Sequence, residues 1–332
     1  MAMPPGCELT FRYRLKYLSD SVRRAAEQGQ LRQPARVLIC YLDQASRDRP
    51  IEFVPIRFAD LVEAPVIGDF VVLRMRMGHA AYSGNPNAFN QDIRARSAEV
   101  PRWPEGESGH AEGAFCLEVA DFPSSVGESS SASEWQKTVS QLQARTDFTD
   151  VGAFYRVVQL NLLSNSAAVG MQDGHYALQP ASEYELVIDH YLPTDSIQTY
   201  QLEVAFSGNS VEPISGSNMQ IDSAYDRHWI RFKTLDPLAA QRAVLTVRKK
   251  EPGADATIQF DLPASIAGNL RKMARVGVAI GLLLALPQAI TAWLNPAFSN
   301  NGLGWWLGLF GFFAISYLLV GLAAAFGFRK PL

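Results

Sequence analysis

The sequence predicts a mainly β protein in three parts: an N-terminal mixed β-rich (α+β) domain, an antiparallel β-sandwich of immunoglobulin-like kind, and a C-terminal two-helix transmembrane hairpin. Three observations support this prediction. Short runs of alternating apolar and polar residues recur along the chain, and turn-forming residues separate these runs regularly in its second half. Two long apolar runs without a charged residue then close the chain.

The N-terminal domain is expected over residues 1–122. Residues 8–18 alternate strictly between apolar and polar side chains, which predicts a half-buried strand. A short helix capped by Ser19 or Asp20 should follow this strand and end at Gly29. Further apolar runs predict three more strands, at residues 36–42, 51–58 and 69–77.

The predicted strands of this domain carry a row of positive charge. Six basic side chains are placed together on one sheet face as candidate ligand-binding residues: Arg12, Arg14, Lys16, Arg57, Arg74 and Arg76. Guanidinium groups bind phosphate and carboxylate groups in a planar, bidentate manner. We therefore expect an anionic small molecule, a nucleotide or a lipid headgroup as the ligand. The alternative is a solvated outer face whose charges pair with Asp and Glu.

Two less regular segments follow the strands. Residues 79–113 are rich in Gly, Pro and Asn, which predicts a long irregular loop, and their aromatic and arginine side chains favour a lid or contact loop. Residues 123–150 are predicted to form a Ser-rich connector and a helix. In this helix Ser133 and Gln136 are expected to make a capping box, with Trp135 on the buried face.

The sandwich is predicted over residues 151–264. Six or seven short alternating runs recur there, with Gly, Pro, Asn and Asp between them. The alternation places four apolar side chains on one inward face: Tyr200, Leu202, Val204 and Phe206. No cysteine pair or other motif specifies a particular family, so only the architecture is predicted.

The membrane hairpin is predicted over residues 270–332. Its two apolar runs, residues 273–293 and 305–328, are long enough as helices to cross a hydrocarbon core of about 30 Å. The turn between the runs is uncharged, whereas basic residues lie at their outer ends: Arg271, Lys272, Arg275, Arg329 and Lys330. Because positive residues stay inside, we expect a protein of the inner (cytoplasmic) membrane whose N-terminal domains and C-terminus are cytoplasmic. The alternative is a buried helical pair in a soluble oligomer.

Small residues recur at helical spacing in both spans. Gly277 and Gly281 form one such pair, and Gly304 and Gly308 form another. This spacing lets helix backbones approach closely, so we interpret the four glycines as candidate membrane oligomerisation residues of a homo-oligomer. The alternative is tight packing of the two helices within one hairpin. Neither span carries an ionisable residue, which argues against proton relay and ion-coupled transport.

Charge and cysteine content limit the possible partners. Residues 111–269 hold 10 Lys and Arg against 20 Asp and Glu, a net charge of −10, so no duplex nucleic acid is expected as a partner. Cys7, Cys40 and Cys116 lack disulfide or metal spacing, which suits a reducing compartment. The N-terminus shows no apolar signal segment, and this agrees with a cytoplasmic head.

Motifs that carry chemistry are missing from the sequence. It contains no Gly-rich phosphate loop, no GxSxG, no HExxH and no CxxC. Asp189 and His190 are neighbours in a predicted strand, where adjacent side chains point to opposite faces, so they are not expected to act together. We therefore predict a non-enzymatic protein with no catalytic residue, no cofactor and no metal.

Two functions fit these features. The first is a membrane sensor and effector, in which the head binds a ligand or partner and drives the hairpins to associate and permeabilise the bilayer. In broad plan the chain resembles the membrane-disrupting effectors of prokaryotic antiviral defence, in which a soluble sensing domain is fused to a few spans. This resemblance is one of architecture, without a shared motif. The second function is a non-enzymatic docking protein that recruits a cytosolic partner to the lipid bilayer through the sandwich.

Overall fold

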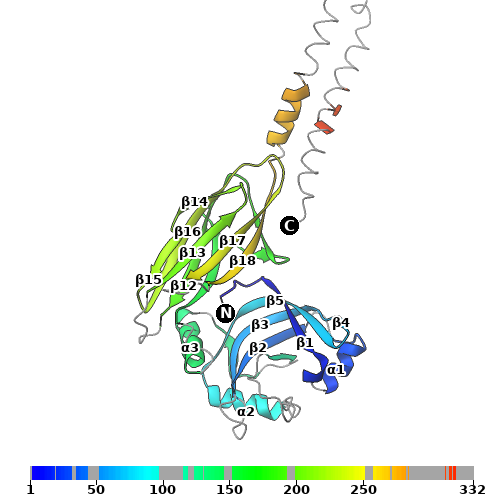
Figure 1. The fold of residues 1–332 in the computed structure, drawn as a ribbon, viewed down its shortest axis with the longest axis vertical. Helices are drawn as coiled ribbons and strands as arrows, with labels where there is room; N and C mark the ends of the chain where they lie inside the picture. The colour runs from blue at the N-terminus through cyan, green and yellow to red at the C-terminus, as the bar shows by residue number, and fades with distance from the viewer. Residues whose placement is uncertain are drawn as a thin grey trace, which may run out of the picture.

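The computed structural model shows a mainly β chain with antiparallel sheets, as predicted (Figure 1). It describes residues 2–18, 20–31, 35–43, 52–96, 115–118, 123–129, 131–145, 152–192, 199–250, 257–269, 271–281, 283, 311, 314–315 and 317–318. The described strands form a seven-stranded sheet in the N-terminal half and two facing sheets in the second half. The predicted domain boundaries remain predictions.

The N-terminal sheet has the order β1-β5-β3-β2-β6, and two short strands, β4 and β7, also pair with β5. Its strands are β1 (Glu8–Arg14), β2 (Ala35–Asp43), β3 (Glu52–Glu63), β4 (Val66–Ile67), β5 (Phe70–Ser83), β6 (Phe115–Glu118) and β7 (Val126–Glu128). The predicted strands at 36–42, 51–58 and 69–77 are therefore confirmed in position, and all three are longer than predicted, the last two by several residues.

The strand expected over residues 8–18 is shorter than the alternation indicates. It ends at Arg14, and Leu15–Tyr17 form a 3₁₀ helix, η1, closed by the hydrogen bond from Leu18 N to Leu15 O. A strand and a short helical turn both keep Leu15 partly buried, so alternation alone does not separate them. The helix α1 (Asp20–Glu27) then ends near Gly29, whose φ of +63° gives the expected left-handed C-terminus.

The irregular loop predicted at residues 79–113 is corrected in its first part. Strand β5 continues to Ser83, and α2 (Pro86–Arg96) follows directly, whereas residues 97–113 lie outside the described residues. The Asn85 side chain accepts a hydrogen bond from Ala88 N at 3.1 Å, and Pro86 fits the first helical position. Phe89 and Ile93, one helical turn apart and buried, fix this helix against the sheet.

The N-cap of helix α3 (Ala132–Gln143) lies two residues before the predicted cap. Ser131, not Ser133, accepts the backbone N–H of Glu134, and the Glu134 carboxylate accepts the N–H of Ser131 in return. Trp135 lies on the buried face as expected. The helix connects the two halves of the molecule, because Trp135 packs against the sandwich residue Phe154 while Arg145 pairs with Asp43 and Glu52 of the N-terminal sheet.

The second half forms two facing sheets, with the orders β10-β11-β18-β17-β13-β15 and β14-β16-β12-β8-β9. The strands are β8 (Phe154–Leu162), β9 (Ala167–Val169), β10 (Met171–Gln172), β11 (His175–Leu178), β12 (Glu183–Tyr191), β13 (Tyr200–Ser207), β14 (Val211–Ser215), β15 (Asn218–Ile221), β16 (Tyr225–Thr234), β17 (Gln241–Lys250) and β18 (Thr257–Ile266). All these pairings are antiparallel except β11 with β18. The alternation pattern did not predict the five shortest strands, which are β9, β10, β11, β14 and β15.

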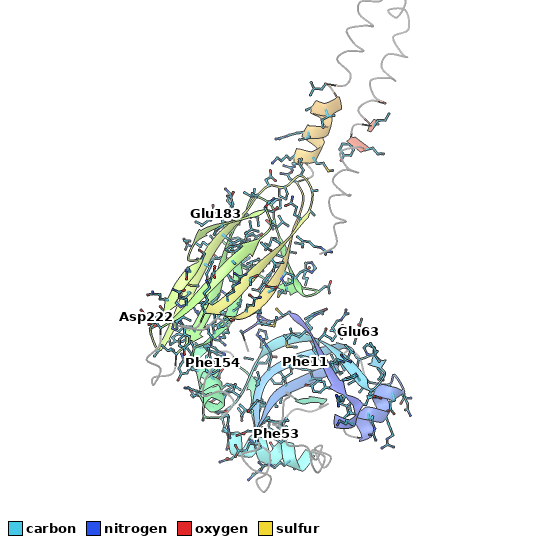
Figure 2. The ribbon with its side chains drawn as sticks, viewed as in Figure 1. Phe11, Phe53, Glu63, Phe154, Glu183 and Asp222 are labelled. Atoms are coloured by element: carbon cyan, nitrogen blue, oxygen red, sulfur yellow. The ribbon has the colours of Figure 1, made fainter. Side chains whose placement is uncertain are left out.

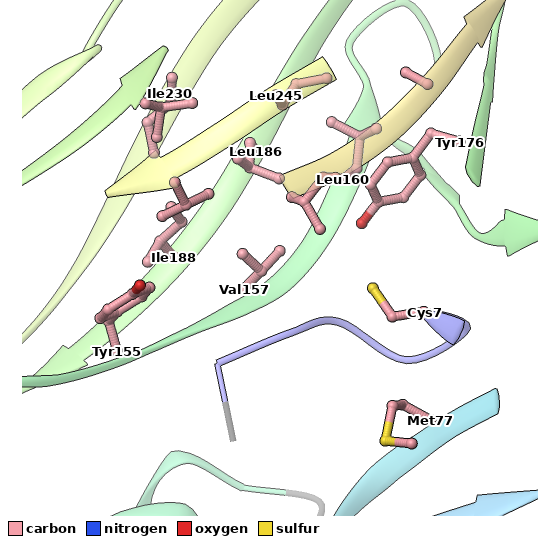
Figure 3. Close-up of a cluster of buried hydrophobic side chains, with 14 of the residues drawn as sticks. Cys7, Met77, Tyr155, Val157, Leu160, Tyr176, Leu186, Ile188, Ile230 and Leu245 are labelled. Atoms are coloured by element: carbon pink, nitrogen blue, oxygen red, sulfur yellow. The ribbon is translucent and has the colours of Figure 1, made fainter. Parts of the chain in front are cut away.

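One apolar core joins the N-terminal sheet to the sandwich. The inward face predicted on β13 is buried at Tyr200, Leu202 and Val204, and Phe206 is half-buried at its end. The same cluster of buried residues continues to Cys7 (Figure 3). The Cys7 thiol lies 3.2 Å from the Met171 sulfur. The N-terminal segment before β1 thus lies between the two bodies, and the head packs as one unit.

The polypeptide leaves the sandwich as a helix over residues 271–281. Glu183 and Asp222 mark opposite ends of the sandwich in Figure 2, and this helix begins at the Glu183 end. The predicted spans at 273–293 and 305–328 lie largely outside the described residues. Within the part of the chain that is described, no helix has the length and apolar character needed to cross a membrane.

Candidate functional site

Two of the six predicted basic residues converge on one aromatic ring. Arg12 and Arg14 are exposed on β1, and the register places Arg14 opposite Phe70 and Arg12 opposite Val72 on β5. The Arg12 guanidinium carbon lies 3.8 Å from the centre of the Phe70 ring, and that of Arg14 lies 5.8 Å away. The ring holds the two guanidinium groups together by cation–π attraction. We call Arg12, Arg14 and Phe70 the basic face.

The basic face retains its hydrogen-bonding capacity. Within the described ranges neither Arg12 nor Arg14 has a carboxylate within ion-pair distance, because the neighbouring positions on β5 are Phe70 and Val72. Each guanidinium carries five N–H donors in a fixed plane, and stacking on a ring leaves these donors directed outward. The arrangement therefore suits a phosphate or carboxylate group.

Arg74 and Arg76 lie further along the same face but are neutralised. Arg74 pairs with Glu63 at 2.9 Å, and Arg76 pairs with Glu8 at 3.0 Å and with Asp173 at 3.2 Å. Asp173 belongs to the turn between β10 and β11, so this ion pair also connects the sheet to the sandwich. Arg74 and Arg76 therefore match the alternative to a ligand site, a solvated outer face whose charges pair with Asp and Glu.

Lys16 and Arg57 do not share the basic face, which corrects the expectation of one continuous row. Lys16 lies in η1, beyond the end of β1. The register of β3 is irregular between Arg57 and Ala59, and Arg57 is only 6% exposed, with Nε donating to the carbonyl of Gly78 at 2.8 Å. Burial lowers the pKa of Arg57 to about 10, so it stays protonated at neutral pH.

A second charged cluster lies beneath α3 and was not predicted. The carboxylate of Asp189 on β12 is fully buried and accepts hydrogen bonds from Arg156 Nη2 at 3.1 Å and from Arg227 Nε at 2.7 Å. These three side chains share one rung of the β8-β12-β16 sheet. The Trp135 ring covers the Arg156 guanidinium at 4.8 Å. Asp189 is enclosed and Arg156 is largely covered, whereas Arg227 reaches the surface, and this shared pairing indicates a structural clamp.

The imidazole of His190 points to the other face of the same strand. Its Nδ1 lies 2.7 Å from Nε2 of His228, and its Nε2 lies 2.9 Å from the carbonyl of Ser223. Asp189 and His190 thus face opposite sides of the sheet, as the alternation predicts. Among the residues described, no group of three or more His, Cys, Asp or Glu side chains is arranged to hold a metal ion.

The histidine pair predicts a pH-dependent stability. Burial, and then the neighbouring His190 ring, lower the pKa of His228 below its ordinary 6.5. The pKa of His228 is therefore lower in the folded chain than in the unfolded chain. At a pH between the folded and the unfolded pKa, the unfolded chain binds more protons than the folded chain, so stability should fall as the pH falls below about 6.5. Denaturant unfolding in detergent at about pH 7.5 and about pH 5.5 should show this loss. His228→Gln should reduce the loss, whereas His79→Gln at an exposed position should leave it unchanged.

The predicted oligomerisation glycines are only partly described. Gly277 is buried, and a Cβ added there would lie 3.3 Å from Cδ2 of Tyr317 of the same chain. Gly281 is also buried, whereas Gly304 and Gly308 lie outside the described residues. The close approach at Gly277 therefore joins two helical segments of one chain, as in the alternative of packing within one hairpin.

No family model matches the sequence, and no curated protein matches it. Among solved structures, a FixG-related protein of Vibrio parahaemolyticus is 13% identical, with a TM-score of 0.24 over 36% of this chain and 98% of that chain. The CsuC–CsuE chaperone–tip adhesion subunit complex of Acinetobacter baumannii is 10% identical, with a TM-score of 0.21 over 28% and 53%. Salmonella alpha-2-macroglobulin reacted with methylamine is 11% identical, with a TM-score of 0.26 over 81% and 16%. These values are too low to indicate a function.

Proposed function

We propose that this chain is a membrane-anchored sensor and effector. Its β-rich head binds a soluble anionic ligand, such as a nucleotide, at the basic face, and ligand binding drives the transmembrane hairpins to associate and permeabilise the membrane. One observation supports the ligand class most directly: Arg12 and Arg14 converge on Phe70 without a carboxylate partner among the described residues. Prokaryotic antiviral defence is the proposed setting.

The hairpin part of this proposal is based on the two uncharged apolar runs and their basic flanks. The attachment of the first helix supports a mechanical connection to the head. Asn269 caps this helix by accepting the N–H of Lys272 at 3.1 Å, and its amide donates to the Asp236 carboxylate at 2.8 Å. Lys272 Nζ also donates to the Asp236 carbonyl at 2.9 Å. Because these bonds attach the helix at 271–281 to the head, a change in how neighbouring heads pack would also reorient this helix in each chain.

The position of the basic face favours a soluble ligand over a lipid headgroup. In Figure 1 the N-terminal sheet lies at one end of the sandwich, and the helix at 271–281 lies at the other. A head anchored through that helix would hold the basic face away from its own bilayer. The anion is then delivered from the cytosol, where nucleotides combine phosphate groups with a ring that stacks on a guanidinium plane.

Coupling between binding and assembly follows a population shift. A ligand favours the assembled state only to the extent that it binds that state more tightly than the single chain. A ligand held between the basic faces of two heads would meet this requirement, because each face supplies two cations that repel those of its neighbour until the anion is present. Permeabilisation is thus proposed to depend on ligand concentration.

Charge reversal at the basic face tests this proposal. The double variant Arg12→Glu, Arg14→Glu should bind a fluorescent trinitrophenyl-ATP probe more weakly than the parent, by about tenfold or more, since two charge-assisted contacts are lost. Binding is measured by titration of the detergent-solubilised full chain. Separate titrations with phosphatidylserine vesicles distinguish a lipid headgroup from a soluble anion, and we expect the difference between the proteins with the soluble probe.

Arg242→Glu provides the matched control, because this arginine is exposed on the sandwich and carries the same charge. It should bind the probe as the parent does. Equal binding by the double variant and the parent would return Arg12 and Arg14 to the role of a solvated outer face.

The docking protein remains the second candidate, and Trp229 favours it. This side chain is 53% exposed on β16, and large exposed aromatic residues are frequent at protein interfaces. Recovery of one stoichiometric cytosolic partner, together with intact membranes after induction, would support docking instead of permeabilisation.

A further inference from the structure

A hollow of about 320 Å³ opens at one edge of the sandwich, between β13 and β14. Phe206, Val211 and Pro213 form its apolar part, and Glu203, Ser217 and Asn218 line it as polar residues. The Phe206 ring is half-buried and lies 5.2 Å from the Phe232 ring, which fixes one wall of the hollow. Its volume is at the small end for a ligand pocket and matches one or two apolar side chains.

A strand edge beside this hollow is without a partner. On one side β13 pairs with β17 over Gln201–Ser207, whereas on the other side its ladder with β15 covers only Tyr200–Glu203. The last hydrogen bond on the β15 side runs from Val204 N to Ser217 O at 2.8 Å. Because alternate residues of a strand direct their N–H and C=O groups to the same side, those of Phe206 face the open edge. Within the described part of the chain, no strand pairs with them.

This edge is short, but it carries neither a proline nor a charge, the two residue features that most often protect an exposed strand. Pro213 blunts the neighbouring edge strand β14, since proline has no N–H to donate. The open part of β13, residues 205–207, reads Ala-Phe-Ser and contains neither a proline nor a charge. An open edge beside an apolar hollow is the arrangement that recognises an extended peptide by strand addition.

Charge indicates what kind of peptide fits. Glu203 at the rim is already paired with Lys250 at 2.7 Å, but Glu212, between two lining residues, is exposed and has no ion pair among the residues described. Residues 111–269, to which both strands belong, carry a net charge of −10, with 10 Lys and Arg against 20 Asp and Glu. A basic peptide is therefore complementary to this edge.

We propose that the hollow between β13 and β14 binds an extended basic segment of a partner protein, which adds as a strand to the open edge of β13 and inserts one apolar side chain beside Phe206. The bound segment would alternate apolar and basic residues, because one face of an added strand enters the hollow and the other faces solvent. This inference goes beyond the proposed anion sensing. It involves different residues and holds whether or not Arg12 and Arg14 bind a ligand.

A peptide selection tests this inference on the full chain in detergent. A phage library of random heptapeptides is selected against the parent and counter-selected against Ser217→Trp, in which an indole ring fills the hollow without replacing a core residue. Enriched peptides should alternate apolar and basic residues, and synthetic copies should bind Ser217→Trp about tenfold or more weakly than the parent by fluorescence anisotropy. Methylating the peptide nitrogen that pairs with Phe206 should weaken binding similarly.

Ser215→Trp is the matched control, since Ser215 is exposed on β14 and does not line the hollow. It should bind the peptides as the parent does. The proposal is overturned if no peptide is enriched, or if the enriched peptides bind Ser217→Trp and the parent equally. It is also overturned if Ser217→Trp instead reduces the oligomer size of the protein without peptide, because a second copy would then occupy the edge.

Discussion

Replacing Asp189 with Asn should destabilise the head by about 3 kcal/mol, the lower part of the range for breaking a buried ion pair. The substitution keeps the side-chain volume but removes the charge that Arg156 and Arg227 share. Arg156 is only 15% exposed and is covered by Trp135, so its charge would remain buried without compensation. Arg227 is 40% exposed and can turn toward water, which keeps the expected cost at the lower part of the range.

The measurement is denaturant unfolding of the full chain in detergent, with Glu185→Gln as the matched control. Glu185 lies on the same strand and pairs with Arg231, whose side chain is 52% exposed. Because the Arg231 end of this pair lies in water, the pair should contribute about 0–1 kcal/mol, and the control should change stability little. The structural clamp is excluded if Asp189→Asn costs no more than Glu185→Gln.

Replacing Gly277 with Leu should abolish membrane leakage after induction. A Cβ at this position would already lie 3.3 Å from Cδ2 of Tyr317 and 3.6 Å from its Cα, and the longer leucine side chain would separate the two helical segments. A hairpin that cannot close cannot present the surface through which hairpins are proposed to assemble. Release of a trapped dye from vesicles containing the purified protein is the readout. Ala279→Leu, at an exposed position of the same helix, should retain leakage.

A second substitution identifies the contact that matters. If Gly277 is needed because it makes room for Tyr317, the double variant Gly277→Leu, Tyr317→Ala should recover leakage. Failure of this rescue, with both proteins inserted equally well, would show that Gly277 faces a different surface, such as the glycine of another chain. Leakage by the single variant at the parent's level would remove both interpretations.

The alternation of apolar and polar residues predicted the longer strands well, because a strand that buries one face places an apolar side chain at every second position. It failed where other constraints decide the conformation. Asn85 and Pro86 are typical of a helical N-terminus, but the Gly and Pro residues of this segment equally favour a loop, and the sequence alone does not separate the two. The register irregularity after Arg57 leaves no mark in the sequence, since it arises from pairing with β5.

The candidate sites show the same limit. Arg12 and Arg14 were identifiable because both lie on one strand, whereas the ion pairs of Arg74 and Arg76 depend on residues distant in sequence. A local signal for the buried cluster did exist: Asp189 is a charged residue within an otherwise apolar strand, and such a residue requires a partner. Only the pairing of β8, β12 and β16 identifies that partner.

Membrane anchorage is the central claim of the proposed function, and fractionation of cells that express the full chain tests it most directly. Membranes are washed with alkaline carbonate, which strips peripheral proteins, and then treated with detergent. We expect the protein to stay in the carbonate pellet and to be released only by detergent. Recovery of the intact chain in the aqueous extract before detergent is added would contradict the proposal.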